Sequence, residues 1–214
     1  YEFLDKNYNT YDSIYDIEGT ILLIQNKAAI DEFSENELFY FASHRNAIFY
    51  SNSNFSQKFA DSLGFEIEYS NDFADSLQFK INRNQKAGNF YFNKGINTAY
   101  FSKIDSSKTE VLGTQINSKG EEFANFIKVK HLNGNFYLHL QPVAFTNYYL
   151  LNKNSQYTED ILGYIPSKSP IYWKVKQYDN EELSSSPMRY LLSQPALKWA
   201  WFLAWITFII FIFF

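Results

Sequence analysis

The sequence predicts an α/β fold in which a parallel-sheet unit is followed by an antiparallel β-rich extension and a C-terminal transmembrane helix. Over residues 20–69, short apolar runs alternate with helix patterns, an order that gives a parallel sheet with right-handed crossovers. Over residues 77–141, short strand patterns are separated by Gly and Asn turns. Residues 199–214 contain no charge, Gly or Pro, which is what a spanning helix needs in lipid.

The chain divides at a polar linker just before residue 184. Residues 1–183 are predicted to form an extracytoplasmic α/β domain, and residues 184–214 a juxtamembrane helix followed by the transmembrane helix. Within the domain, residues 1–75 carry the strand–helix alternation, residues 76–145 the β-rich part, and residues 146–183 short helices and the linker.

Apolar runs in the first part are typical of buried strands. These runs are 20–25, 47–51 and 65–69. Between the first two runs, Ser34 and Glu37 form an S-x-x-E capping box, which predicts the start of a helix. This helix is expected to end near His44.

A second helix is predicted between the last two of these strands. Asn52, Ser53 or Asn54 is expected to cap its start, because these side chains accept hydrogen bonds from the first free backbone N–H groups. The helix ends at Leu63, and Gly64 supplies the left-handed residue that follows a helix.

The β-rich part is predicted from strand patterns and one strong hairpin signal. The strand candidates are 77–81, 89–92, 99–104 and 109–113. The hairpin strands are 126–132 and 136–141. Asn133-Gly134 is the strongest two-residue hairpin loop signal, and it pairs Leu132 with Asn135.

This register sorts the hairpin side chains onto two faces. The apolar face is predicted to be buried, and it carries Ile127, Val129, His131, Phe136, Leu138 and Leu140. The mostly polar face is predicted to be wet or at a rim, and it carries Phe126, Lys128, Lys130, Leu132, Asn135, Tyr137, His139 and Gln141. Because His131 and His139 fall on opposite faces, they cannot share a metal ion.

The composition excludes several classes of function. A net charge of −4 with a sequence pI near 5.4 has the wrong sign for nucleic-acid binding. The absence of Cys excludes thiol catalysis, disulfides and thiolate metal sites. The sequence contains no phosphate-cradle, zinc-protease or G-x-S-x-G motif.

Acidic residues gather at the start of the first predicted helix. They are Asp31, Glu32, Glu35 and Glu37. Such a cluster either binds a cation or is a solvated helix N-terminus favoured by the macrodipole. The second interpretation is preferred, and we expect no metal and no cofactor.

A candidate ligand site lies where the last hairpin strand meets a short helix. Its residues are Gln141, Thr146, Asn147 and Tyr148. In open α/β sheets, ligands bind at the carboxyl ends of strands. The alternative is that Asn147 is only a helix cap.

The C-terminal run predicts an anchor in a membrane, with lipid as a partner. Basic and aromatic residues near its start are typical of the membrane interface, and they are Arg189, Lys198, Trp199, Trp201 and Trp205. The alternative is a buried core helix, but the run is apolar on every side. We expect the natural chain to continue beyond both Tyr1 and Phe214.

The stretches AFTNYYLL, SSSPMRYLLSQPALKWAW and ANFIKVKHLNGNFYLHLQP resemble a family of bacterial membrane proteins described as domain of unknown function 4350. The likeness extends back through ELFYFASHRNAIFYS. It implies a class I glutamine amidotransferase-like (flavodoxin-like) fold on the periplasmic side of the cytoplasmic membrane. It also implies association with a MoxR-type AAA+ ATPase and von Willebrand A-type proteins, and it supplies no catalytic or binding residues.

We therefore expect a non-catalytic membrane-anchored domain that acts as an interaction or sensing component of a membrane-associated assembly with a MoxR-type AAA+ ATPase. Amidotransferase-like folds hold the nucleophile on a sharp turn after a strand, a turn that needs small residues. This chain has neither Cys nor Gly there, so Ser51 and Ser53 are expected to be helix caps. The alternatives are a small-ligand or glycan-binding module and a hydrolase or amidotransferase relic.

Overall fold

The computed structural model describes residues 18–26, 30, 32–70, 76–82, 89–117, 119–151, 154–166, 169–174 and 195–213. Residues 1–17, the predicted linker before residue 184 and the predicted juxtamembrane helix with Arg189 lie outside these residues. The chain divides into two compact units, Tyr1–Lys174 and Val175–Phe214. Each unit is considered separately below.

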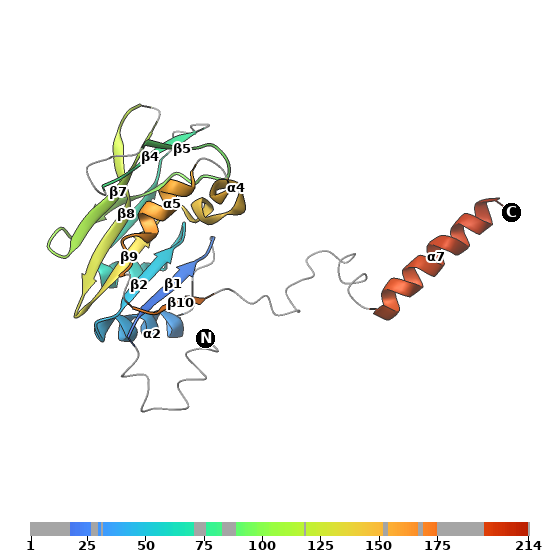
Figure 1. The fold of residues 1–214 in the computed structure, drawn as a ribbon, viewed down its shortest axis with the longest axis horizontal. Coiled ribbons are helices and arrows are strands. Elements are labelled where there is room, and N and C mark those ends of the chain that lie inside the picture. Colours follow the sequence, from blue (N-terminus) through green and yellow to red (C-terminus); the bar gives the residue numbers. More distant parts are fainter. Residues whose placement is uncertain are drawn as a thin grey trace. The chain divides into compact units, whose positions relative to one another are not determined.

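A ten-stranded mixed sheet forms the first unit (Figure 1). Its strands are β1 Thr20–Ile24, β2 Ala47–Ser51, β3 Phe65–Tyr69, β4 Leu77–Ile81, β5 Asn89–Phe92, β6 Ala99–Ile104, β7 Thr109–Ile116, β8 Glu122–His131, β9 Gly134–His139 and β10 Ile171–Lys174. The strand order is β10-β1-β2-β9-β8-β7-β4-β5, while β6 pairs with β8 and β3 with β6. The pairs β10–β1, β1–β2 and β2–β9 are parallel, and every other pair is antiparallel.

The predicted parallel-sheet amidotransferase-like (flavodoxin-like) unit is wrong for this sheet, which is mostly antiparallel. Strand β3 forms at the predicted residues, but it pairs antiparallel with β6. The parallel neighbours of β1 and β2 are instead β10 and β9, which come from the far end of the domain. Local apolar periodicity locates a strand without naming its partner, and the parallel pairing was therefore assigned to the wrong strand.

Five helices accompany the sheet among the described residues of the first unit. They are α2 Glu32–Ser43, α3 Gln57–Leu63, η2 Pro142–Phe145, α4 Asn147–Leu150 and α5 Ser155–Leu162. Ser34 lies inside α2, so the predicted capping box is wrong. The start of α3 is capped by Ser56, whose Oγ accepts a hydrogen bond from the Phe59 N–H at 3.1 Å. Gly64 ends α3 with φ 74°, which confirms the predicted left-handed residue.

Replacing Ser56 by Ala is expected to lower the free energy of unfolding by about 1 kcal/mol, because the Phe59 N–H loses its acceptor. The matched control is Ser53→Ala, at the position where the sequence predicted a cap. Urea unfolding of both variants measures the difference. A larger loss at Ser53 than at Ser56 would show that the helix starts earlier than Gln57.

The hairpin of β8 and β9 forms with a register two residues away from the predicted one. His131 pairs with Gly134, so the loop residues are Leu132 and Asn133, and Leu132 takes φ 50°. Gly134 is instead the first residue of β9, and the position requires glycine because a Cβ there would overlap the carbonyl oxygen of Ala42 near the end of α2. A shift of two residues keeps every side chain on its predicted face.

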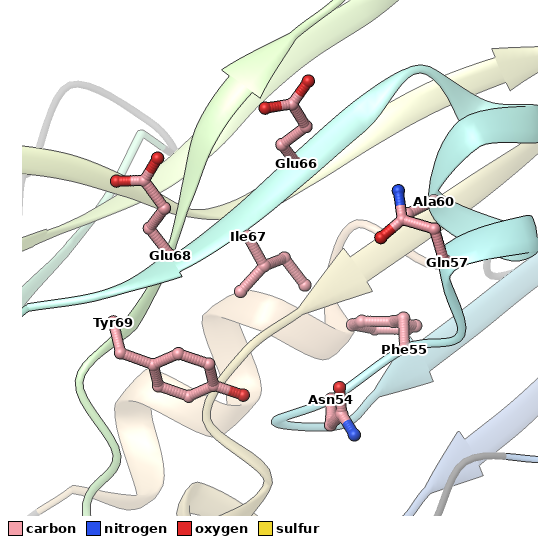
Figure 2. Close-up of a pocket in the computed structure, with 8 residues that line it drawn as sticks. All are labelled: Asn54, Phe55, Gln57, Ala60, Glu66, Ile67, Glu68 and Tyr69. Carbon is pink, nitrogen blue, oxygen red and sulfur yellow. The ribbon is translucent and has the colours of Figure 1, made fainter.

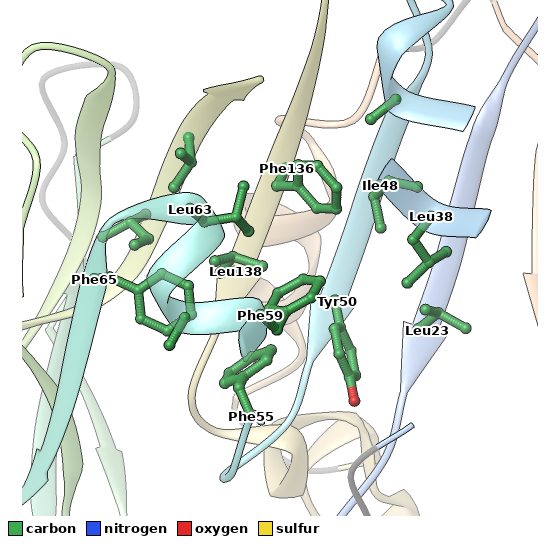
Figure 3. Packing of buried hydrophobic residues seen from close by; sticks show 14 of the residues in the cluster. Leu23, Leu38, Ile48, Tyr50, Phe55, Phe59, Leu63, Phe65, Phe136 and Leu138 are labelled. Carbon is green, nitrogen blue, oxygen red and sulfur yellow. The ribbon is translucent and has the colours of Figure 1, made fainter. Parts of the chain in front are cut away.

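Away from its tip, the hairpin is nevertheless buried on both faces. One apolar cluster packs the sheet against α2 and α3 and includes Ile48, Phe59, Phe136 and Leu138 (Figure 3). A second cluster packs the opposite face against α4 and α5 and includes Phe49, Phe126, Tyr137, Tyr149 and Tyr157. The prediction that this second face is wet or at a rim is wrong for Phe126, Tyr137 and His139, because the short helices that follow β9 cover them. Lys130 and Leu132, near the hairpin tip, are exposed as predicted.

The second unit contains helix α7, Pro195–Phe213. Among the residues that the structure describes, no helix is long and apolar enough to cross a membrane. The predicted C-terminal span is therefore wrong, and so is the location in the cytoplasmic membrane that rested on it. Of the predicted interface residues, Lys198, Trp199 and Trp205 are exposed and Trp201 is half-buried.

Candidate functional site

A chain of buried polar side chains runs from the carboxyl end of β2 to α5. Ser51 Oγ lies 2.9 Å from His139 Nδ1, and His139 Nε2 lies 3.1 Å from the Tyr157 hydroxyl. Asn125 of β8 donates from Nδ2 to the same hydroxyl at 3.3 Å. All four residues have an exposed fraction of 0%. This hydrogen-bonded network therefore links the carboxyl ends of β2 and β9 to strand β8 and helix α5.

The protonation states in this hydrogen-bonded network follow from its burial. Burial lowers the pKa of His139 to about 3 and raises the pKa of Tyr157, so both groups are neutral near pH 7. The neutral imidazole carries one proton, so one of its two ring nitrogens donates and the other accepts, and the contacts to Ser51 and Tyr157 take their directions from that tautomer.

Full burial gives Ser51 and His139 a structural role. A general base must come within reach of the proton that it abstracts from a substrate or nucleophile, whereas both side chains have an exposed fraction of 0%. The predictions that Ser51 is a helix cap and that His139 is wet are both wrong, because Ser51 belongs to β2 and α5 covers His139. The sequence signal that was missed is a His flanked by Leu138 and Leu140 at the end of a strand.

The ligand site predicted from sequence is not assembled in the structure. Gln141 is buried, and its side chain accepts a hydrogen bond from Asn97 N at 3.3 Å and donates to Asn97 O at 2.5 Å. Thr146, Asn147 and Tyr148 are exposed at the start of α4. The α4 N-cap is Thr146 rather than Asn147. Gln141 therefore anchors the backbone that precedes β6, and it does not join the exposed Thr146, Asn147 and Tyr148 in one site.

A groove of about 340 Å³ lies beside the carboxyl end of β2 (Figure 2). One wall is the loop from β2 into α3 together with the first turn of α3, and the other is strand β3. The lining residues are Asn54, Phe55, Gln57, Ala60, Glu66, Ile67, Glu68 and Tyr69. Small-molecule sites commonly measure about 300–1,000 Å³, so the groove has room for a small ligand. Sequence reasoning missed it because its two walls belong to different elements.

Hydrogen bonds made by Asn52 and Tyr69 hold the loop wall of the groove in place. Asn52 donates from its backbone N–H to His139 O at 3.0 Å, and from Nδ2 to the Tyr50 hydroxyl at 3.0 Å. Across the groove, the Tyr69 hydroxyl donates to Ser53 O at 3.1 Å. Burial raises the pKa of Tyr50 to about 12, so its hydroxyl keeps its proton. The groove is thus built before any ligand arrives.

The carboxylates of the groove are already engaged by neighbours on β6. Glu66 Oε1 lies 2.8 Å from Lys103 Nζ, and Glu68 accepts a hydrogen bond from the Tyr100 hydroxyl at 3.0 Å. The hydrogen bond to Glu66 raises the pKa of Lys103, and the one to Glu68 raises the pKa of Tyr100. Among the described residues, no group of three or more His, Asp and Glu side chains could hold a metal ion.

Comparison with known proteins gives structural likeness alone. No protein family and no curated protein matches the chain. An exo-β-1,4-mannosidase from Opitutaceae bacterium strain TAV5 is 12% identical with a TM-score of 0.48, and the match covers 70% of this chain and 25% of that one. A β-galactosidase from Bacillus circulans sp. alkalophilus is 11% identical with a TM-score of 0.42, covering 58% and 20%. The chain thus spans about a quarter or less of these proteins' length.

These solved structures are glycoside hydrolases, not amidotransferases. The amidotransferase-like class is overturned by the mostly antiparallel sheet, and the prediction that the chain is not an enzyme finds no support, since these similar structures are enzymes. TM-scores below 0.5 assign no activity to this chain. The resemblance to domain of unknown function 4350 stays a prediction, since no family matches.

Proposed function

We propose that this domain recognises a small ligand in the groove between the β2–α3 loop and strand β3. The observation that supports it most strongly is the fixed groove itself. Its loop wall is tied to the buried Ser51–His139 pair, while Asn54 and Tyr69 stay exposed. A rigid scaffold that presents exposed polar and aromatic groups around a hollow is typical of binding sites.

Recognition of this kind agrees with the expected role as an interaction or sensing component. The MoxR-type AAA+ ATPase assembly implied by the family resemblance stays a prediction, as do protein and lipid partners. The net charge of −4 keeps nucleic acid outside the proposed ligands.

The site is tested by filling the groove. Asn54→Trp places a large side chain at an exposed position of the loop wall, so folding is expected to survive. Ligand-observed NMR with a library of small fragments should then show hits for the natural chain that the variant loses. The matched control is Asn147→Trp, at the exposed site that the sequence predicted. Loss of the hits in Asn147→Trp alone would move the site to α4.

A further inference from the structure

The charges of the groove exclude one ligand class and disfavour another. None of its lining residues is Lys, Arg or His, and its charged members are Glu66 and Glu68. An anionic ligand would be repelled and would find no cation. A cationic ligand would have to displace Lys103 from Glu66 and Tyr100 from Glu68. A neutral ligand meets neither cost.

The apolar part of the groove is an aromatic platform. The Tyr69 side chain is 54% exposed, yet its hydroxyl is fixed on Ser53 O. Ile67 and Phe55 line the groove next to it (Figure 2). A flat apolar face of a ligand can therefore lie against the Tyr69 ring at little entropic cost, since the ring is already held.

The side-chain amides of Asn54 and Gln57 supply the polar part of the groove. No hydrogen bond engages the Asn54 side chain within the described residues, and Gln57 uses its Nε2 for Asp61 at 2.8 Å, which leaves its Oε1 to accept. Amides that both donate and accept suit hydroxyl groups, which do the same. A ligand with one apolar face and several hydroxyls is a carbohydrate.

An extended peptide fits the groove less well. Strand β3 is an edge strand in the described sheet, with β6 as its one partner, and edge strands can accept an added strand. Strand β3 carries the exposed charged side chains Glu66 and Glu68. Charged side chains protect edges from added strands.

We infer that the ligand of this groove is a neutral carbohydrate, held with an apolar sugar face on the Tyr69 ring and its hydroxyls on Asn54 and Gln57. This inference rests on the proposed binding function of the groove and specifies its ligand class. The geometry favours a unit of one or two sugars, because the hollow is small.

The inference is tested by titrating the whole chain with lactose, cellobiose and maltose and measuring binding by NMR. At least one disaccharide should bind the groove. Tyr69→Ala should weaken that binding by about tenfold, because the stacking surface is lost. Tyr69→Phe keeps the ring but loses the hydrogen bond to Ser53 O, so it should bind more weakly than the natural chain and more tightly than Tyr69→Ala. Tyr91→Ala removes a similarly exposed tyrosine on β5 and should leave the affinity unchanged.

Three other probes separate failure of the ligand class from failure of the site. They are spermidine as a cation, glucose 6-phosphate as an anion and a strand-forming tetrapeptide. If one of these binds the groove and no neutral disaccharide does, the carbohydrate inference is overturned while the site stands. If no probe and no fragment reaches the groove, the proposed function itself fails.

Discussion

Replacing Val129 by Asp should destabilise the domain by about 3 kcal/mol or more, because it buries an unpaired carboxylate. Val129 has an exposed fraction of 0% and lies in the cluster with Ile127 and Phe136. Chemical unfolding followed by circular dichroism gives the loss in the free energy of unfolding. Lys130→Asp is the matched control, since Lys130 is an exposed neighbour on the same strand.

Phe126→Asp should be as damaging as Val129→Asp. Phe126 lies on the opposite face of β8 but is also fully buried, under the aromatic cluster with Phe49 and Tyr157. The sequence pattern alone predicts a wet face there and a small effect. A loss at Phe126 close to that of Lys130→Asp would therefore contradict the two-sided burial of the hairpin.

Acid should destabilise the domain through His139. Its pKa is about 3 in the fold, against about 6.5 in an unfolded chain. The unfolded state therefore binds a proton first as the pH falls. The stability contributed by the neutral imidazole is complete above about pH 6.5, and below it is lost at about 1.4 kcal/mol per pH unit, down to the folded pKa.

His139→Gln tests this because it removes the titrating group. The free energy of unfolding should be measured from pH 7 to pH 5, above the range where most carboxylates titrate. The variant should show a flatter dependence on pH than the natural chain, whatever its stability at pH 7. His131→Gln should keep most of the slope, since His131 is only half-buried. An unchanged slope in His139→Gln would mean that the imidazole is hydrated in the fold.

Most elements of this fold could be predicted from the sequence, because their signals are local. Strand β4 forms at the predicted residues, and Gly64 ends α3 as expected. Helix starts were placed less well, since several neighbouring Ser and Asn residues compete as caps and packing selects Ser56. Strand partners could not be predicted, because the placement of β9 between β2 and β8 depends on contacts across the whole domain.

The candidate site could not be predicted for a related reason. The groove depends on Asn54 and Tyr69 meeting across two elements, and neither residue is conspicuous in its own stretch. Gln141 was a reasonable candidate at a strand end, but Asn97 satisfies its side chain. His139 was assigned to a wet face because the covering helix α5 follows it in the chain and leaves no mark on the hairpin pattern.

The most direct test of a ligand groove beside β2 is a map of backbone amide shifts across the whole chain during titration with the best-binding fragment or disaccharide. We expect the largest changes in amide chemical shift on both walls of the groove, at Asn54, Gln57, Ile67 and Tyr69. Shifts gathered around Asn147 and Tyr148 would contradict it, as would binding that leaves both walls unchanged.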